Sequence, residues 1–410
     1  MSEYKRIRVL ACDHLNLARG KYLSPTAASK NVTHLSIGTY ALGYDRVMTP
    51  APGTLMYDGL PDMDAIFDLG SIQNGWEQDT GIVIADFYRN DKPVPMCGRS
   101  RLKQSIVNWK SHGLEPVIGI EFEAFLFQRS ENAGWEPYNT PGAFVYGTGS
   151  IVDPDRLMDL IWEQAHKCGF DLELINSEYD CSQFEFTLRH KNALLAVDEA
   201  FLFRVMAREL LASKGYLLSF MPKPLTDRGG SGFHINFSFT NDEGDNVIAD
   251  ASSSDGISKV GKQSIAGLLH HHAGLACLVA PSVNSYRRIK PGNLAAYWAN
   301  WGYDHRGVTV RIPDERESAA RLEYRLPDCS SNPYVAAAAT LEAARLGMLN
   351  DYKLLAPETG DCLEQSDSDQ VAPETLGAAM EALASDNLLK TTMGVPLVEH
   401  LLAIKQKEWT

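Results

Sequence analysis

The stretch GIEFEAFLF, residues 119–127, decides how the rest of the chain is interpreted. Its residues alternate in character, as expected for a buried strand whose successive side chains point to opposite faces. One face carries Ile120, Phe122, Ala124 and Leu126, and the other carries Glu121, Glu123, Phe125 and Phe127. Burying an unpaired carboxylate costs several kcal/mol, and a second like charge on the same face adds to that cost. We therefore expect a positively charged group to lie between Glu121 and Glu123.

Three later segments repeat this pattern of one apolar and one polar face. They are SQFEFTL (182–188), FHINFSF (233–239) and RLEYRL (321–326). Their polar faces carry Glu185 in the first, His234, Asn236 and Ser238 in the second, and Arg321, Glu323 and Arg325 in the third. Glu178 precedes Glu185 by a few residues, and we expect it in the loop that leads into that strand.

A single glutamate on the polar face of a strand is usually just solvated, and a single histidine there is usually structural. Four strands with the same pattern instead predict a curved sheet whose polar faces converge. Such a sheet would bring together Glu121, Glu123, Glu178, Glu185, His234 and Glu323. Carboxylates with one imidazole suit Mg²⁺ or Mn²⁺ better than a zinc site built from thiolates. Six ligands are enough for two ions, as in many phosphoryl-transfer sites.

Arginines cluster in the segments around these candidate ligands. They occur in NSYRRIKPG (284–292), YDHRGVTVRIPDERES (303–318) and RLEYR (321–325), and a glycine-rich turn, RGGSG, spans 228–232. Arginine binds phosphate or carboxylate through two donors. Ion pairing at the surface is the alternative explanation, above all for Arg316. Metals and arginines beside a glycine-rich turn favour a nucleoside triphosphate together with an acidic co-substrate.

Composition limits the class of protein. The chain has 410 residues and a formal net charge of -14, which disfavours nucleic acid or an anionic membrane as a main partner. No apolar run is long enough to span a bilayer, and the first ten residues lack the apolar core of a signal peptide. The seven cysteines form no CxxC pair. We therefore expect reduced thiols and a cytoplasmic location.

The pattern along the chain predicts two domains of mixed α+β structure. Residues 1–98 alternate short strands with turns rich in glycine and proline, and a helix predicted at 99–113 marks the border of a second domain, 99–410. Further helices are predicted at 153–168, 193–214, 255–280, 332–349 and 374–406.

Six motifs in a fixed order carry a resemblance to a known family. They are GIEFEAFLF, FMPKP (220–224), GGSGFHINFSF (229–239), NSYRRIKPG, RIPDERESAARLEYRLPD (311–328) and NPYVAAAATLEAARLG (332–347). Together they resemble the glutamine synthetase family over roughly residues 115–350, whereas the first 100 residues match only loosely. The resemblance implies an N-terminal β-grasp-like domain and a C-terminal catalytic domain whose curved antiparallel sheet is flanked by helices. It also implies ATP as co-substrate and a ring-like homo-oligomer with sites between subunits.

The resemblance assigns roles to individual residues. One metal would be held by Glu123, Glu178 and Glu185, and the other by Glu121, His234 and Glu323. The α-carboxylate of glutamate would be bound by Arg288 and Arg325, with backbone contacts from Gly230. The ATP site would use Arg306, Arg311, Arg321, Asn236 and Ser238, and Arg306 would also act in catalysis. Glu121 and Glu123 would then share a face because each holds one of two neighbouring ions.

Departures from the family pattern concern the nitrogen substrate. In the family, the NSY motif leads through Pro-Gly to a flap glutamate that binds and deprotonates ammonium, but Leu294 stands at that position here. Asn236 replaces a usual histidine, and Gly229 and His305 replace usual asparagines. The family's FDGSS segment, which brings a catalytic aspartate from a neighbouring subunit, has no clear counterpart, and Asp45 in LGYDRV is the nearest candidate.

These departures favour a ligase that joins glutamate to an organic amine, such as an alkylamine, a polyamine or an arylamine, through a γ-glutamyl phosphate. An apolar residue at position 294 suits the carbon chain or ring of a larger amine. Glutamine synthetase using ammonia is one alternative. A family member that has lost catalysis and has a structural or regulatory role is another.

Overall fold

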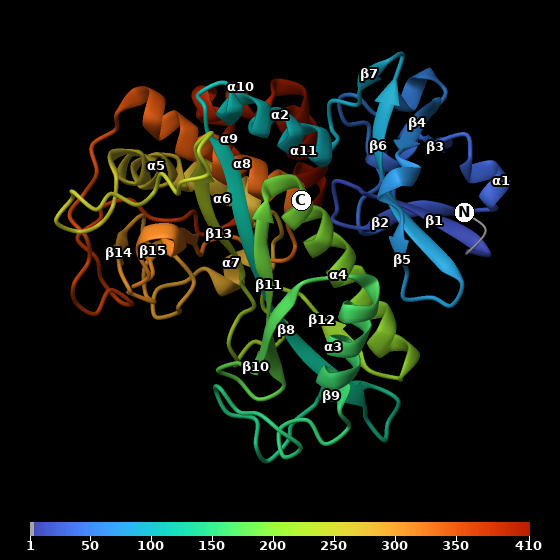
Figure 1. Ribbon diagram of the computed structural model, residues 1–410, viewed down its shortest axis with the longest axis horizontal. Coiled ribbons are helices and arrows are strands. Elements are labelled where there is room, and N and C mark those ends of the chain that lie inside the picture. The colour runs from blue at the N-terminus through green and yellow to red at the C-terminus, as the bar shows by residue number, and fades with distance from the viewer. Residues whose placement is uncertain (1–3) are drawn as a thin grey trace.

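A computed structural model describes residues 4–410 and contains two β-sheets with helices packed against them (Figure 1). The first sheet has the order β2-β1-β6-β4-β3, with β5 and β7 paired to β6. Its strands are β1 (Arg6–Cys12), β2 (Ala18–Leu23), β3 (Val32–Ser36), β4 (Asp62–Phe67), β5 (Gln73–Asn74), β6 (Thr80–Arg89) and β7 (Lys92–Pro93), and the short helix α1 (Pro25–Ala28) follows β2. Strands β1 and β6 are parallel, whereas the other pairs are antiparallel. This sheet has a hydrophobic core of its own that includes Tyr40 and Phe87.

The second sheet carries the segments singled out from the sequence. Its order is β10-β11-β8-β13-β16-β15-β14, and β9 and β12 also pair with β8. The strands are β8 (Glu115–Arg129), β9 (Trp135–Pro137), β10 (Leu172–Ser177), β11 (Gln183–Asn192), β12 (Leu217–Ser219), β13 (Phe233–Thr240), β14 (Trp301–Tyr303), β15 (Val310–Ile312) and β16 (Leu322–Tyr324). All pairs except β14–β15 are antiparallel. The expected α+β fold with a curved, mainly antiparallel catalytic sheet is therefore confirmed.

Helices pack against this sheet and against one another. They are α2 (Gly98–Lys110), α3 (Leu157–Cys168), α4 (Ala193–Ser213), α5 (Lys259–His270), α6 (His272–Val279), α7 (Ser285–Arg288), α8 (Pro333–Asn350), α9 (Leu376–Ser385), α10 (Asn387–Met393) and α11 (Val395–Trp409). Phe122 of β8 stacks on Phe203 of α4, and Trp109 of α2 stacks on Phe239 of β13 at a centroid distance of 3.9 Å. Burial of these large rings fixes the apolar face of the sheet against the helices and leaves its polar face free to form a site.

Two predicted helices differ from those observed. The segment 255–280 begins only at Lys259, where Ser258 accepts a hydrogen bond from Gly261 N, and it is interrupted at His271. The segment 374–406 is three helices rather than one, because Asp386 caps α10 and Gly394, with a positive φ of 91°, separates α10 from α11. Periodicity alone does not reveal such breaks when apolar residues continue across them.

Ion pairs connect the first sheet to helices that pack beside the second sheet. Arg8 of β1 makes two 2.7 Å hydrogen bonds to Glu209 of α4, and Arg99 of α2 pairs with Asp86 of β6 and Asp198 of α4. The domain border at residue 98 stays a prediction, although α2 starts there. All seven cysteines lie in the described part of the chain and are unpaired. No helix within residues 4–410 is both long and apolar enough to cross a membrane.

Candidate active site

The six predicted metal ligands form two neighbouring groups. Ligand atoms of Glu121, His234 and Glu323 lie within 4.8 Å of one another, and so do those of Glu123, Glu178 and Glu185. Strand register explains this arrangement, because Glu185 pairs with Glu123 across β11 and β8, and His234 pairs with Glu121 across β13 and β8. Glu178 lies in the loop between β10 and β11, as expected.

Arginine side chains lie beside the first group and pair with its buried glutamate. His234 Nδ1 lies 3.3 Å from Glu121 Oε2 and 3.6 Å from Glu323 Oε1, while its Nε2 lies 3.7 Å from Glu123 Oε1. Glu323 is buried and pairs with Arg311 at 2.8 Å and with Arg325. Burial by itself would raise the pKa of Glu323, but Arg325, His234 and Arg311 outweigh it and lower the pKa to about 2.

The second group lacks such compensation. Burial, together with Glu121, Glu123, Glu178 and Glu323, raises the pKa of Glu185 to about 9. Among residues 4–410, the side-chain carboxylate of Glu185 has no hydrogen-bond or ion-pair partner. Burial and then Glu123 likewise raise the pKa of Glu178. A divalent cation would supply the missing charge, and oxygen donors of this kind fit Mg²⁺ or Mn²⁺.

A pocket of about 430 Å³ joins the second group to the predicted substrate residues. Its walls include Glu123, Glu178, Gly230, Arg288, Arg306 and Arg325. Arg288 is buried and donates from Nη1 and Nη2 to the carbonyl oxygens of Leu326 and Arg325 at 2.9 and 3.1 Å. A Cβ at Gly230 would lie 2.7 Å from Arg288 Cγ and 2.9 Å from Pro222 O, so only glycine fits there. We call this cavity the substrate pocket.

The predicted ATP residues do not all lie together. A separate pocket of about 290 Å³ is lined by Glu121, Asn236, Ser238 and Arg321. Arg306 instead lines the substrate pocket. Arg311 pairs with Asp304 and Glu323 and lines neither pocket among the residues that the structure describes. Glu121 lines the separate pocket and Glu123 lines the substrate pocket, and both lie on the same face of β8, so the two pockets meet at the two ligand groups.

Several residues of the substrate pocket were missed by sequence reasoning. Gln183 Nε2 donates to Gly230 O at 2.9 Å and so holds the glycine turn. Val145, Tyr146, Tyr179 and Leu363 line the pocket together with Leu294. Adjacency to Glu178 could have indicated Tyr179. Leu363 carries no comparable signal, because it comes from the long segment after α8.

Leu294 lies in the wall of the substrate pocket and is half exposed. Asp45, the candidate catalytic aspartate, does not line this pocket within the described chain. Its Oδ2 instead pairs with Lys407 of α11 at 3.1 Å.

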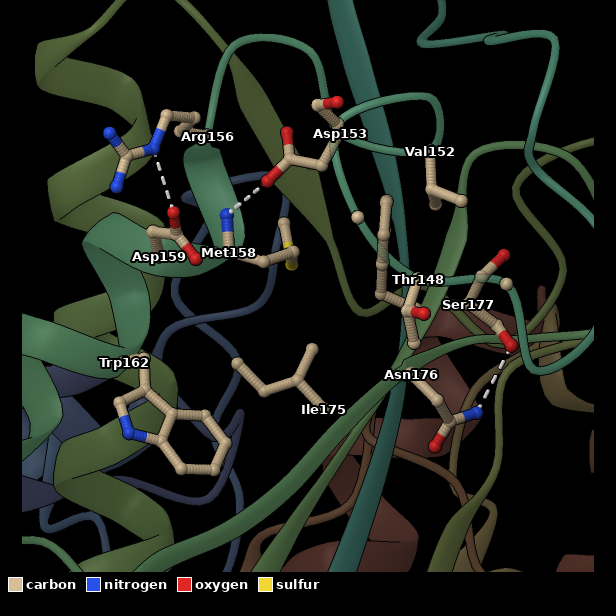
Figure 2. A pocket seen from close by; sticks show the side chains of 14 residues that line it. Thr148, Val152, Asp153, Arg156, Met158, Asp159, Trp162, Ile175, Asn176 and Ser177 are labelled. Atoms are coloured by element: carbon tan, nitrogen blue, oxygen red, sulfur yellow. Dashed lines mark hydrogen bonds and ion pairs between the residues drawn. The ribbon is translucent and has the colours of Figure 1, made fainter.

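Another pocket of about 290 Å³ lies on the α3 side of β10 (Figure 2). Met158 and Trp162 of α3 lie across it from Ile175 and Asn176 of β10. It contains none of the predicted site residues, although its wall includes Ser177, which immediately precedes Glu178.

Comparisons with known proteins agree with this geometry. Residues 95–410 match the family model described as glutamine synthetase, catalytic domain. The glutamine synthetase of Pyrococcus woesei is 28% identical over an alignment covering 100% of this chain and 91% of that protein. A glutamate–methylamine ligase of Methyloversatilis universalis is 30% identical, with 82% of this chain and 78% of that protein covered.

Solved structures are similar along nearly the whole length. A structure titled "GmaS/ADP complex-Conformation 1" has a TM-score of 0.87 at 26% identity and covers 99% of this chain and 93% of that one. One titled "Crystal structure of novel glutamine synthase homolog" has a TM-score of 0.85 at 22% identity, with 99% and 94% covered. Because the family model spans most of the sequence and the paired ligand groups lie within it, the chain belongs to the glutamine synthetase family.

Proposed function

We propose that the protein is an ATP-dependent ligase that joins glutamate to an organic amine and forms a γ-glutamyl amide through γ-glutamyl phosphate. Family membership makes it a ligase that uses ATP, a divalent metal ion, glutamate and a nitrogen substrate. The observation that carries the organic amine is the wall of the substrate pocket, where Leu294 stands beside other apolar side chains.

The first half of the reaction needs activation of a carboxylate, which is a poor electrophile. Phosphoryl transfer from ATP to the γ-carboxylate of glutamate makes an acyl phosphate with a good leaving group. Bound divalent ions would be held by the two ligand groups and would neutralise charge on the phosphoryl oxygens. Arg306 lines the substrate pocket and would stabilise the same charge, and Arg325, which lines the same pocket, would bind the α-carboxylate.

The second half needs an amine that reaches the acyl phosphate. A small ammonium ion requires a nearby carboxylate to be captured, which Leu294 does not provide. A larger amine instead gains about 0.8 kcal/mol for each methylene that it buries. Three or four buried carbons would therefore offset a missing ion pair. The relative named glutamate–methylamine ligase supports this assignment, since it acts on an amine by name.

Ammonia as the nitrogen substrate is the second candidate, because most of the similar curated proteins are named glutamine synthetases. A non-catalytic role is a third. Glu185 argues against a non-catalytic role. Its burial among other carboxylates disfavours its charged form, and such a residue would not stabilise a purely structural protein.

The test is a panel of ammonium and organic amines with glutamate and ATP, followed by ADP release and by mass detection of the amide. We expect at least one organic amine to exceed ammonium tenfold in kcat/KM, which corresponds to about 1.4 kcal/mol. Leu294→Glu should shift the ratio toward ammonium, whereas the uncharged control Leu294→Gln should not. If ammonium is the best substrate of the unmodified protein, the organic-amine assignment is wrong and glutamine synthetase stands.

We further propose a ring-like homo-oligomer in the cytoplasm, with each site completed by the N-terminal domain of a neighbour. The position of Asp45 supports this, because it lies outside the substrate pocket of its own chain. Light scattering tests the assembly, and a fully active monomer would contradict it.

A further inference from the structure

His305 lies in the turn between β14 and β15 that also carries Arg306, and both of its ring nitrogens form hydrogen bonds. Gly307 N donates to His305 Nδ1 at 3.0 Å, and His305 Nε2 lies 2.7 Å from Gly360 O. A carbonyl oxygen can only accept, so Nε2 carries the ring proton and Nδ1 is the acceptor. One neutral imidazole therefore holds its own turn and a segment 55 residues later in the chain.

The segment that contains Gly360 also forms part of the wall of the substrate pocket. Leu363 of this segment lines the pocket, and its carbonyl oxygen accepts a hydrogen bond from Gly292 N at 2.8 Å. His305 therefore connects two parts of that wall, the turn that carries Arg306 and the segment that carries Leu363.

The direction of the Arg306 side chain depends on the backbone of this turn. The guanidinium group lines the substrate pocket but has no hydrogen-bond or ion-pair partner among residues 4–410. On one side of the turn, Asp304 N donates to Ile312 O at 2.8 Å, and the carboxylate of Asp304 pairs with Arg311. On the other side, the turn is held by the hydrogen bonds of His305.

The imidazole is also closely packed between the turn and the later segment. A Cβ built on Gly307 would lie 3.0 Å from His305 Cε1 and 3.0 Å from Cys362 Sγ. The same sulfur lies 3.8 Å from His305 Nε2. Removal of the imidazole would thus open a gap at the base of the turn and break two hydrogen bonds at once.

We propose that His305 is a positioning residue that fixes the turn so that the guanidinium group of Arg306 is directed at the phosphoryl group being transferred. This inference rests on the proposed function, in which Arg306 stabilises charge on that group. An asparagine, which the resemblance leads us to expect at position 305, would reach only as far as His305 Nδ1 does. It could accept from Gly307 N, as asparagine does in many turns, but it would be too short to reach Gly360 O.

A double-substitution cycle tests the proposal, with ADP release measured for whichever nitrogen substrate reacts best, ammonium included. His305→Ala should lower kcat about tenfold and leave the KM for ATP unchanged, because a displaced charge-stabilising group loses much of its effect. When Arg306 is already alanine, His305→Ala should change kcat less than about twofold, because no guanidinium group remains to be positioned. His112→Asn is the control, since this exposed histidine does not line the substrate pocket, and it should leave kcat unchanged.

His305→Asn separates the two hydrogen bonds, because it keeps the acceptor for Gly307 N and loses the contact with Gly360 O. Hydrogen exchange followed by mass spectrometry should show faster exchange in the segment 358–366 for both the alanine and the asparagine variant. In the segment 304–312, only His305→Ala should exchange faster. The kcat of His305→Asn should be at least threefold above that of His305→Ala.

Three results overturn the inference and leave the ligase intact. The first is an equal loss of kcat from His305→Ala with and without Arg306, which would assign a purely structural role to His305. The second is an unchanged kcat in Arg306→Ala, and the third is a His305→Asn variant no more active than His305→Ala. An amide formed from ammonium alone overturns the proposed function instead, and the cycle then proceeds with ammonium.

Discussion

Replacing Glu185 by glutamine should stabilise the metal-free protein and at the same time remove its response to Mn²⁺. Glu185 lies among four other carboxylates without a cationic partner in the described chain, and burial followed by these neighbours raises its pKa to about 9. At neutral pH the folded chain must therefore take up a proton that the unfolded chain has released. Glutamine has nearly the same shape and needs no proton.

The magnitude follows from the shift in pKa. The ordinary pKa of 4.5 lies 2.5 units below pH 7, and each unit corresponds to about 1.4 kcal/mol, so the cost at pH 7 is about 3.5 kcal/mol. Relaxation of the neighbouring side chains reduces this, and we expect a gain of about 1–3 kcal/mol. Between pH 4.5 and pH 9 the folded state holds the extra proton, so stability of the unmodified metal-free protein should fall as pH rises. The stability of the Glu185→Gln variant should lack this part of the dependence on pH.

Urea unfolding followed by circular dichroism, with chelator or with Mn²⁺, measures both effects between pH 7.5 and 8.5. Glu199→Gln is the matched control, because Glu199 is a comparably buried carboxylate that pairs with Lys191 and accepts from Asp171 N at 2.7 Å. Its replacement should destabilise the protein and preserve the effect of Mn²⁺. A metal-free Glu185→Gln protein that is less stable than the unmodified one, or one that keeps the full response to Mn²⁺, would refute the reasoning.

Three further changes test other parts of the structure. Glu323→Gln should cost about 3–5 kcal/mol in urea unfolding, because it leaves buried Arg325 without its carboxylate partner; a loss below 1 kcal/mol would contradict this. Burial and nearby His14 lower the pKa of His400 to about 3, so stability should fall as pH drops below 6.5, and His400→Gln should reduce this slope by up to about 1.4 kcal/mol per pH unit. Gly230→Ala should displace Arg288 and raise the KM for glutamate about tenfold while the KM for ATP stays constant.

Strand alternation accounts for most of what could be predicted from the sequence. The two-residue period assigned Glu121, Glu123, Glu185 and Glu323 to polar strand faces, and the curved sheet brings them together with His234. This works because register across β8 is fixed by the burial of the opposite face, where a slip of one residue would move Ile120 and Phe122 out of the core. His234 lies within reach of both Glu121 and Glu123, where the sequence predicted a positively charged group.

The apolar part of the substrate-pocket wall could not be predicted, because its residues come from segments without a regular period. Val145 and Tyr146 lie in an irregular loop, and Leu363 lies in the extended segment after α8. Their placement depends on single hydrogen bonds between distant segments, such as that from Gly292 N to Leu363 O. A contact of this kind leaves no signal in composition or spacing. For the same reason, the sequence did not reveal that Arg306 lines the substrate pocket whereas Arg321 lines the neighbouring pocket.

The two ligand groups differ in how their negative charge is balanced, and this difference bears on the order in which metal and substrate bind. The first group holds Glu323 between Arg311 and Arg325, so it keeps its negative charge and its geometry without a metal. In the second group, burial and the neighbouring carboxylates raise the pKa of Glu185 to about 9, so a bound cation would take the place of a proton there. The substrate pocket opens onto this second group. Its electrostatic field therefore changes most when the metal binds, and productive binding of the anionic substrate should follow metal binding rather than precede it.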